Sequence, residues 1–175
     1  SLQEAQRDVG QLDALRNALA TKTVRTAETD RFQQFSTPPA YAYVVNWVAN
    51  LNADDLVLEP SAGHGAIARF FPDSTNRHAV EPSNELAGRL ALNATDTEIH
   101  NVRFEDYNIT HKFDAIIMNP PFGAVREGGD TKVFRVGDYA TKSADHAITI
   151  AALQSLAPKG KAVIIVGGAR GDQDS

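Results

Sequence analysis

The tetrapeptide Asn119-Pro120-Pro121-Phe122 directly follows the largely apolar run 113–118 and carries residue types that suit ligand binding. Each proline lacks a backbone N–H and holds φ at about −65°, so the run must end in a stiff turn. The residue before a proline is held in an extended conformation. The turn therefore presents an amide side chain, two carbonyls and an aromatic ring. These groups can accept hydrogen bonds from an amine and stack on a planar group, which predicts a site for a planar group that bears an NH₂.

A second candidate site is the segment 59–65, Glu-Pro-Ser-Ala-Gly-His-Gly, which joins a predicted strand to a helix. Gly63 and Gly65 allow positive φ and a close approach of the backbone to a ligand. With Ala68 they match a dinucleotide-binding fingerprint, but only weakly. Glu59 would repel a pyrophosphate, and the glycines come several residues after the strand instead of opening the turn. A carboxylate here suits a ligand with a positive charge, such as an ammonium group.

Glu81 ends the next predicted strand and is placed to accept both hydrogen bonds of a ribose diol. A ligand that combines adenosine with a charged amino acid is S-adenosylmethionine, and we expect this cofactor. A tight strand-to-helix turn without a ligand stays the alternative for the two glycines. A solvated strand end is the alternative for Glu81.

Strands and helices alternate along most of the chain, and the predicted strands are mostly apolar. This pattern predicts an α/β fold with a Rossmann-like, doubly wound, mostly parallel sheet flanked by helices. Strands are expected at 55–59, 77–81, 99–104, 113–118 and 162–166. Helices are expected at 3–20, from 36 towards 52, from the glycine turn to 71, and at 83–94 and 144–156. Hydroxyl side chains and prolines at 36–39 predict a capped helix start. Ligands of such sheets bind beyond the carboxyl ends of the strands, where both candidate sites fall.

Composition limits the function further. The chain has 175 residues, of which 42% are hydrophobic and 22% charged, so it can bury a core as a single domain. It has no cysteine, which excludes disulfides and thiolate metal sites and fits an intracellular, cytoplasmic setting. No apolar stretch approaches the roughly 20 residues that span a bilayer, so no membrane association is expected. The histidines at 64, 78, 100, 111 and 146 show no ligand spacing, and no metal site is expected.

The formal net charge of −5 is informative, because proteins that bind nucleic acid unaided usually present a basic face. If the chain acts on nucleic acid, we expect another domain or subunit to supply much of the nucleic-acid-binding surface. The segment 123–142 is the one long stretch without clear periodicity, and it contains four glycines. Loops of this length are usually functional or disordered. Because it adjoins the double-proline turn, a lid or substrate loop and plain disorder both stay open.

The glycine turn, Glu81 and the double-proline turn occur in the order found in class I S-adenosylmethionine-dependent methyltransferases, and the chain resembles this family over about residues 35–166. More narrowly, it resembles the N6-adenine DNA methyltransferases in which the cofactor motif precedes the catalytic one. The segments that carry this resemblance most specifically are 58–65 and 114–123. The segment Phe35-Ser36-Thr37-Pro38-Pro39 is similar to the family's N-terminal cofactor motif, which implies that Thr37 contacts the methionine carboxylate.

The resemblance also implies roles for other residues. Phe104-Glu105-Asp106-Tyr107 aligns with the segment that binds the cofactor's adenine, which points to Asp106 for the amino group and Tyr107 for the ring, with Glu105 as the alternative. The catalytic residues are then Asn119, Pro120, Pro121 and Phe122. The cofactor-binding residues are Thr37, Glu59, Pro60, Ser61, Gly63, Gly65, Glu81, Pro82, Asp106, Tyr107 and Asn119.

The implied activity is methyl transfer to an exocyclic amino group, adenine N6 in double-stranded DNA. Methyltransferases of RNA guanine N2 and of protein glutamine share the double-proline turn and stay open as alternatives. A third alternative is a non-catalytic module of a larger nucleic-acid-processing protein. The family's catalytic domains have seven strands, whereas the fifth predicted strand here ends near 166. We therefore expect an N-terminal helix and connector at 1–34 and a catalytic domain at 35–175 that is part of a larger protein.

Overall fold

A five-stranded parallel sheet forms the centre of the computed structural model, which describes residues 1–18, 36–73, 76–127 and 129–166. The strand order is β3-β2-β1-β4-β9, and all four neighbouring pairs are parallel. The strands are β1 Leu56–Glu59, β2 Asn76–Val80, β3 Thr97–His100, β4 Phe113–Met118 and β9 Leu156–Ile164. This arrangement confirms the predicted Rossmann-like, doubly wound fold.

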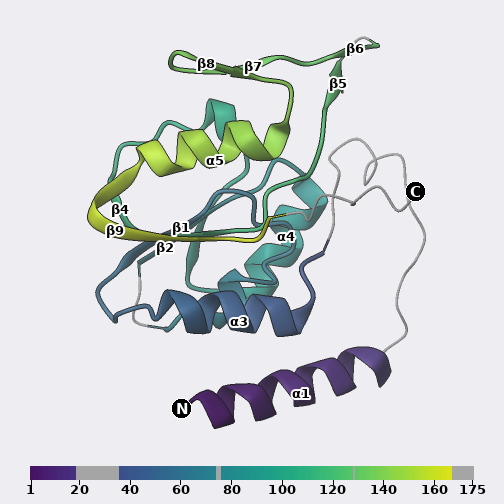
Figure 1. Cartoon of the computed structure of the whole chain (residues 1–175), viewed down its shortest axis with the longest axis vertical. Coiled ribbons are helices and arrows are strands. Elements are labelled where there is room, and N and C mark those ends of the chain that lie inside the picture. The colour runs from purple at the N-terminus through teal and green to yellow at the C-terminus, as the bar shows by residue number, and fades with distance from the viewer. Residues whose placement is uncertain (19–35, 74–75, 128, 167–175) are drawn as a thin grey trace, which may run out of the picture.

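Helices cover both faces of the sheet, as Figure 1 shows with α5 on one side and α3 on the other. The α-helices are α1 Leu2–Ala18, α3 Pro39–Ala49, α4 Asn84–Asn93 and α5 Ala144–Gln154. Two short 3₁₀ helices are η1 Ala68–Phe70 and η2 Phe104–Asp106. Helix α1 packs on the far side of α3, where the Tyr43 hydroxyl donates a 2.9 Å hydrogen bond to Asp8. No helix among the described residues is long and apolar enough to cross a bilayer.

The apolar strands pack against these helices in two clusters, one on each face. The first joins α3, η1 and α4 to the sheet through buried residues such as Val45, Ile67 and Leu90. The second joins α5 and η2 through residues such as Ala152 and Phe104. Because both faces are buried in the middle of the sheet, β1 and β4 lack an alternating pattern, and this is why the sequence predicts a parallel sheet.

The strand order reverses between β1 and β4. From β1 the chain proceeds outward to β2 and β3, whereas β9 lies on the other side of β4. The carboxyl ends of β1 and β4 flank this switch point, and they carry Glu59 and Asn119. The topology thus brings the two candidate sites to the edge where ligands bind in this fold.

Several predicted boundaries are wrong. The segment after the glycine turn forms turns and the single 3₁₀ helix η1 instead of an α-helix, because Pro72 follows within a few residues and leaves too little chain for several turns. The third strand is 97–100 instead of 99–104, since residues 104–106 form η2. Strand β9 begins at Leu156, six residues before the predicted start.

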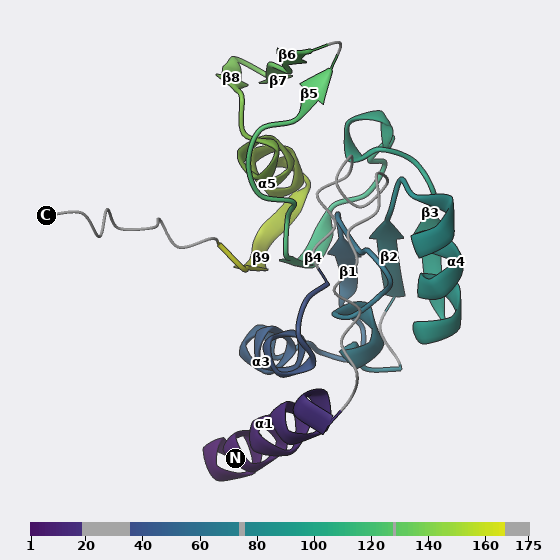
Figure 2. The same ribbon diagram turned by 90° about the vertical axis from the view of Figure 1, so that its right-hand side faces the viewer.

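The segment 123–142 contains two short antiparallel hairpins. They are formed by β5 Arg126–Glu127 with β6 Asp130–Thr131, and by β7 Phe134–Val136 with β8 Tyr139–Thr141. The hairpins extend beyond α5, away from the sheet (Figure 2). Gly137-Asp138 between two short β-prone runs is a hairpin signal that the search for periodicity missed. Gly137 indeed has a positive φ of 57°.

Some predictions concern residues outside the described ranges. They are the connector 21–34, residues 19 and 20 of the first helix, the domain boundary at 34/35 and Phe35.

Candidate active site

Asn119 lies at the carboxyl end of β4, and its two side-chain polar atoms have different surroundings. The Nδ2 donates a 3.0 Å hydrogen bond to the Thr37 hydroxyl, although 82 residues separate the two. The Oδ1 is buried and accepts no hydrogen bond from any described residue. Thr37 itself is buried, with 8% of its surface exposed. One end of the amide is therefore held, and its carbonyl oxygen remains available as an acceptor.

The hydroxyls at 36 and 37 do not cap α3, contrary to the prediction. Pro38 occupies the cap position without a side-chain hydrogen bond. Instead, the Ser36 hydroxyl lies 2.7 Å from the His64 Nε2 in the glycine turn. The two hydroxyls thus tie the start of α3 to the glycine turn and to Asn119. A cap signal and a site contact use the same residue types, so sequence alone cannot separate them.

The glycine turn is bonded to its neighbours on both sides. Ser61 Oγ donates a 3.2 Å hydrogen bond to the Asn119 carbonyl, and the Ala62 N–H donates to the Val80 carbonyl at 2.9 Å. Gly63 and Gly65 have φ of 57° and 86°, the left-handed conformations that the sequence predicts. Pro60, between this turn and β1, is fully buried.

Glu81 follows β2 and is 5% exposed. One carboxylate oxygen accepts from the Gly63 N–H and the other from the Ser83 N–H, both at 2.8 Å. Burial raises the pKa of Glu81, although these two N–H groups act in the opposite direction. Its own carbonyl accepts a 2.7 Å hydrogen bond from Asn101, and Pro82 beside it is half-buried. Glu81 is therefore held rigidly, and each of its oxygens keeps a second lone pair.

Glu59 is more deeply buried, at 1% exposed. It accepts a hydrogen bond from the Ala68 N–H, while its Oε2 has no partner among the described residues. Burial raises the pKa of Glu59 well above 4.5, and the nearby Glu81 raises it further. Two buried carboxyl groups at adjoining strand ends favour a cationic ligand, because a positive charge stabilises their ionised forms.

The predicted adenine-binding residues lie on η2 and just after it. Asp106 is exposed, and Tyr107 packs on His100 with 4.4 Å between ring centroids. Both line a shallow depression beside the end of β3. Glu105 forms a 3.0 Å ion pair with Lys132 in the hairpin segment. Burial raises the pKa of Glu105, but Lys132, a backbone hydrogen bond and Arg103 together outweigh it, and the net shift is downward. Glu105 is thus engaged elsewhere, whereas Asp106 is accessible.

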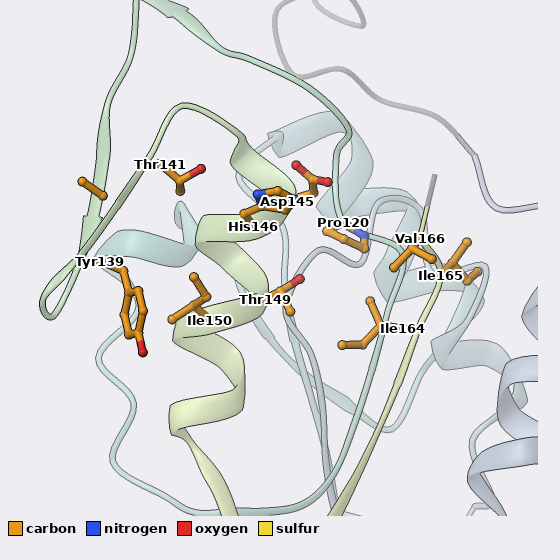
Figure 3. Close-up of a pocket in the computed structure, with 11 residues that line it drawn as sticks. Pro120, Tyr139, Thr141, Asp145, His146, Thr149, Ile150, Ile164, Ile165 and Val166 are labelled. Atoms are coloured by element: carbon orange, nitrogen blue, oxygen red, sulfur yellow. The ribbon is translucent and has the colours of Figure 1, made fainter. Parts of the chain in front are cut away.

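A cavity of about 490 Å³ lies beside the double-proline turn. It is bounded by β8, α5 and the end of β9, and Figure 3 shows Tyr139 on one side and Pro120 on the other. Its lining is mostly apolar, with Asp145, His146 and Thr149 of α5 as polar members. Pro121 and Phe122 are half-buried and do not line it. The cavity has the size and the lining of a small-molecule or base pocket.

The residues present fit S-adenosylmethionine. A cationic ligand would stabilise the ionised forms of the buried Glu59 and Glu81 carboxyl groups, and Glu81 also has free acceptor capacity for a diol. The glycine turn leaves room above Gly63, where an added Cβ would meet nothing within 4 Å. Sequence reasoning missed His64 and Ser36 as parts of this network, because their pairing depends on how α3 returns to the sheet.

Comparison with known proteins supports the resemblance. Residues 89–169, which include the double-proline turn, match the family model of the N-6 DNA methylases. The comparison with curated proteins gave no match.

Three solved structures share the fold. A chain assigned as the modification subunit of a type I restriction enzyme from Vibrio vulnificus has a TM-score of 0.58 at 15% identity, covering 91% of this chain and 38% of that one. A chain assigned as a class I S-adenosylmethionine-dependent methyltransferase from Listeria monocytogenes has a TM-score of 0.52 at 15% identity. The match covers 97% of this chain and 55% of that one. A chain assigned as an RNA methyltransferase from Pyrococcus horikoshii has a TM-score of 0.51 at 21% identity. The match covers 70% of this chain and 63% of that one.

At these identities the likeness establishes the fold, and the chain spans less than two thirds of each of the three. S-adenosylmethionine is the cofactor of this family, which confirms the cofactor prediction. The chain therefore has the class I S-adenosylmethionine-dependent methyltransferase fold, and its residues 89–169 match the model of the N-6 DNA methylase family.

Proposed function

We propose that residues 35–175 form a catalytic domain that transfers a methyl group from S-adenosylmethionine to an exocyclic amino group, adenine N6 in DNA. Residues 1–34 are its N-terminal helix and connector. The observation that carries this proposal is the state of Asn119. Its amide is held at Nδ2 by Thr37, and its buried Oδ1 has no partner among the described residues. A buried acceptor without a donor is costly, and a substrate amine would satisfy it.

The chemistry needs this acceptor. The exocyclic amine of adenine is a poor nucleophile because its lone pair is conjugated with the ring. Hydrogen bonds from the amine to the Asn119 Oδ1 and the Pro120 carbonyl favour a more tetrahedral nitrogen, which frees the lone pair. When bound, S-adenosylmethionine supplies an electrophilic methyl group, which the nitrogen takes as the carbon–sulfur bond breaks. The amine loses its proton afterwards, so no strong base is required, and positioning is worth ~7–11 kcal/mol.

On the cofactor side, we assign the ribose diol to Glu81 and the positively charged amino-acid end to the region of Glu59 and the glycine turn. Pro60, Ser61, Gly63, Gly65 and Pro82 shape this part of the site. Asp106 and Tyr107 hold the adenine. We assign Thr37 to the orientation of the Asn119 amide in place of the cofactor's carboxylate, because its hydroxyl already accepts from Asn119.

A base inside a duplex cannot reach the double-proline turn, so it must be flipped out at a cost of a few kcal/mol. Stacking on Phe122, which is half-buried, offsets about 1–3 kcal/mol of this cost. The cavity beside Pro120 is large enough to take a planar base.

The family match favours DNA over the other amino-group substrates, because the model that matches residues 89–169 is that of the N-6 DNA methylases. The net charge of −5 favours a partner or further domain that supplies the basic surface. The likeness to a chain assigned as a modification subunit supports this multi-subunit setting.

The experiment compares Asn119→Ala with Glu81→Ala. Asn119→Ala is expected to abolish methyl transfer and to leave cofactor affinity within a few-fold. Glu81→Ala is expected to weaken cofactor binding by ~1.5–3 kcal/mol, the loss expected for charge-assisted hydrogen bonds. Activity is measured as the transfer of a tritiated methyl group to DNA free of adenine methylation, to RNA and to protein. Calorimetry measures the affinity for the cofactor. Asn17→Ala, an exposed change on α1, is the control.

Equal loss of cofactor binding in both variants would contradict the division of roles. Methyl transfer to RNA or protein alone would reassign the substrate. If the unaltered chain did not bind the cofactor, the result would favour the alternative that the chain is a non-catalytic module.

A further inference from the structure

Three potential metal ligands meet on one face of the sheet at its β2–β3 edge. His78 on β2 is paired directly with Glu98 on β3, and His100 follows two residues later on β3. Residues i and i+2 of a strand point to the same face, and directly paired residues of neighbouring strands also share a face. The backbone register alone therefore brings the two imidazoles and the carboxylate together.

Their distances suit a tetrahedral metal. His78 Nδ1 lies 3.1 Å from His100 Nε2, and the Glu98 oxygens lie 3.7 Å from the first nitrogen and 3.5 Å from the second. One ligand atom from each residue lies within 4.8 Å of the others. Zinc with bonds of about 2.0–2.1 Å to four tetrahedral ligands places those atoms roughly 3.3–3.4 Å apart. Small rotations of the side chains would reach this geometry.

The surroundings hold the two rings. His78 is buried and packs edge-on against Phe113 with 5.6 Å between centroids, while His100 packs against Tyr107. Glu98 is largely exposed and lines, with His100, a depression of about 280 Å³ that opens to solvent. A cation can therefore enter.

We propose that His78, Glu98 and His100 form a binding site for a divalent transition metal of the zinc class. Imidazole and carboxylate ligands without thiolate suit Zn²⁺ and its neighbours in the first transition row. Solvent supplies the fourth ligand. His111, whose ring lies 5.8 Å from that of His78, stands outside the set. Without metal, the two nitrogens share a proton in a hydrogen bond.

The proposed role of the metal is structural, and the metal takes no part in the methyl-transfer step. It joins the edge strand β3 to β2 at the point where the His100 carbonyl accepts from the Glu81 and Val102 N–H groups, at 3.1 and 2.9 Å. A bound metal would therefore stabilise the strand end that anchors Glu81.

The test uses the untagged full chain, stripped with a chelator and titrated with Zn²⁺ by calorimetry. We expect one equivalent to bind and the melting temperature to rise. Co²⁺ in its place should give the visible absorption of a four-coordinate complex. His100→Ala and Glu98→Gln are each expected to lower the affinity for Zn²⁺ at least about tenfold. His146→Ala, which removes an exposed histidine of α5, is the control and should bind as the unaltered chain does.

His78→Ala is avoided as the main variant because the loss of a buried ring would also disturb folding. Absence of stoichiometric binding by the unaltered chain would overturn the proposal, as would binding that His100→Ala and Glu98→Gln leave unchanged. None of these readouts involves methyl transfer, so failure here is distinguishable from failure of the proposed activity.

Discussion

At the scale of single residues, Thr37 is the position where two roles compete. The resemblance assigns its hydroxyl to the cofactor's carboxylate, whereas the structure shows it accepting from the Asn119 amide. A residue that orients the amide acts on the reaction, and one that binds the carboxylate acts on affinity. These effects separate in kinetics.

Thr37→Val is therefore expected to lower kcat up to about tenfold, as for the loss of a hydrogen bond of ~0.5–1.5 kcal/mol, with cofactor affinity essentially unchanged. Valine keeps the shape and removes the acceptor. Steady-state kinetics and calorimetry on the same preparation measure the two quantities. Thr37→Ser retains the hydroxyl and should recover most of kcat. A weaker cofactor affinity at an unchanged kcat would instead assign Thr37 to the carboxylate.

At the scale of elements, the glycine turn positions the site, and its two glycines are needed for different reasons. Gly65 has φ +86°, and an added Cβ would lie 2.7 Å from Leu90 Cδ1 on the buried side of α4. Gly63 has φ +57° and open space around it. Gly63 thus requires only a left-handed backbone, whereas Gly65 also requires the absence of a side chain.

Gly65→Ala is expected to destabilise the chain by about 1–3 kcal/mol, through backbone strain and displacement of Leu90. Gly63→Ala should cost less, about 1–2 kcal/mol, because strain acts alone. Gly88→Ala is the matched control in the exposed interior of α4 and should stabilise by ~0.5–1 kcal/mol. Urea unfolding of the three variants gives these differences. Equal costs at 63 and 65 would show that the contact with α4 does not matter.

At the scale of the whole molecule, Glu59 couples stability to pH. Its pKa is raised in the fold, so the folded chain binds its proton more tightly than the unfolded chain. That stabilisation is fully present below the ordinary value of 4.5 and is lost as pH rises through the folded-state pKa.

Glu59→Gln removes the titration and keeps the shape. Relative to this variant, the unaltered chain should lose about 1.4 kcal/mol per pH unit between 4.5 and the raised pKa, and then no more. Urea unfolding from pH 4.5 upward measures the difference. Glu85→Gln, an exposed change on α4, controls for the loss of a carboxyl group. A difference independent of pH would show that Glu59 is not perturbed by the fold.

Local sequence was sufficient for much of this molecule. The apolar strands, the double-proline turn after β4, the glycine turn after β1 and the Ser83 start of α4 each depend on residues within a few positions of one another. Steric limits on proline and glycine, and burial of whole strands, act at that range. The fold class and the strand ends that carry the site therefore follow from the sequence.

Contacts between distant segments required the tertiary structure. The Thr37–Asn119 hydrogen bond joins positions 82 residues apart, and the His78, Glu98 and His100 cluster depends on the register between two strands. Register and packing are set by the whole core and leave no signal at any one position. By itself, the sequence determined which residues stand at the ends of the strands. The tertiary structure alone decided which of them meet, because those meetings arise from the order and pairing of strands that are remote along the chain.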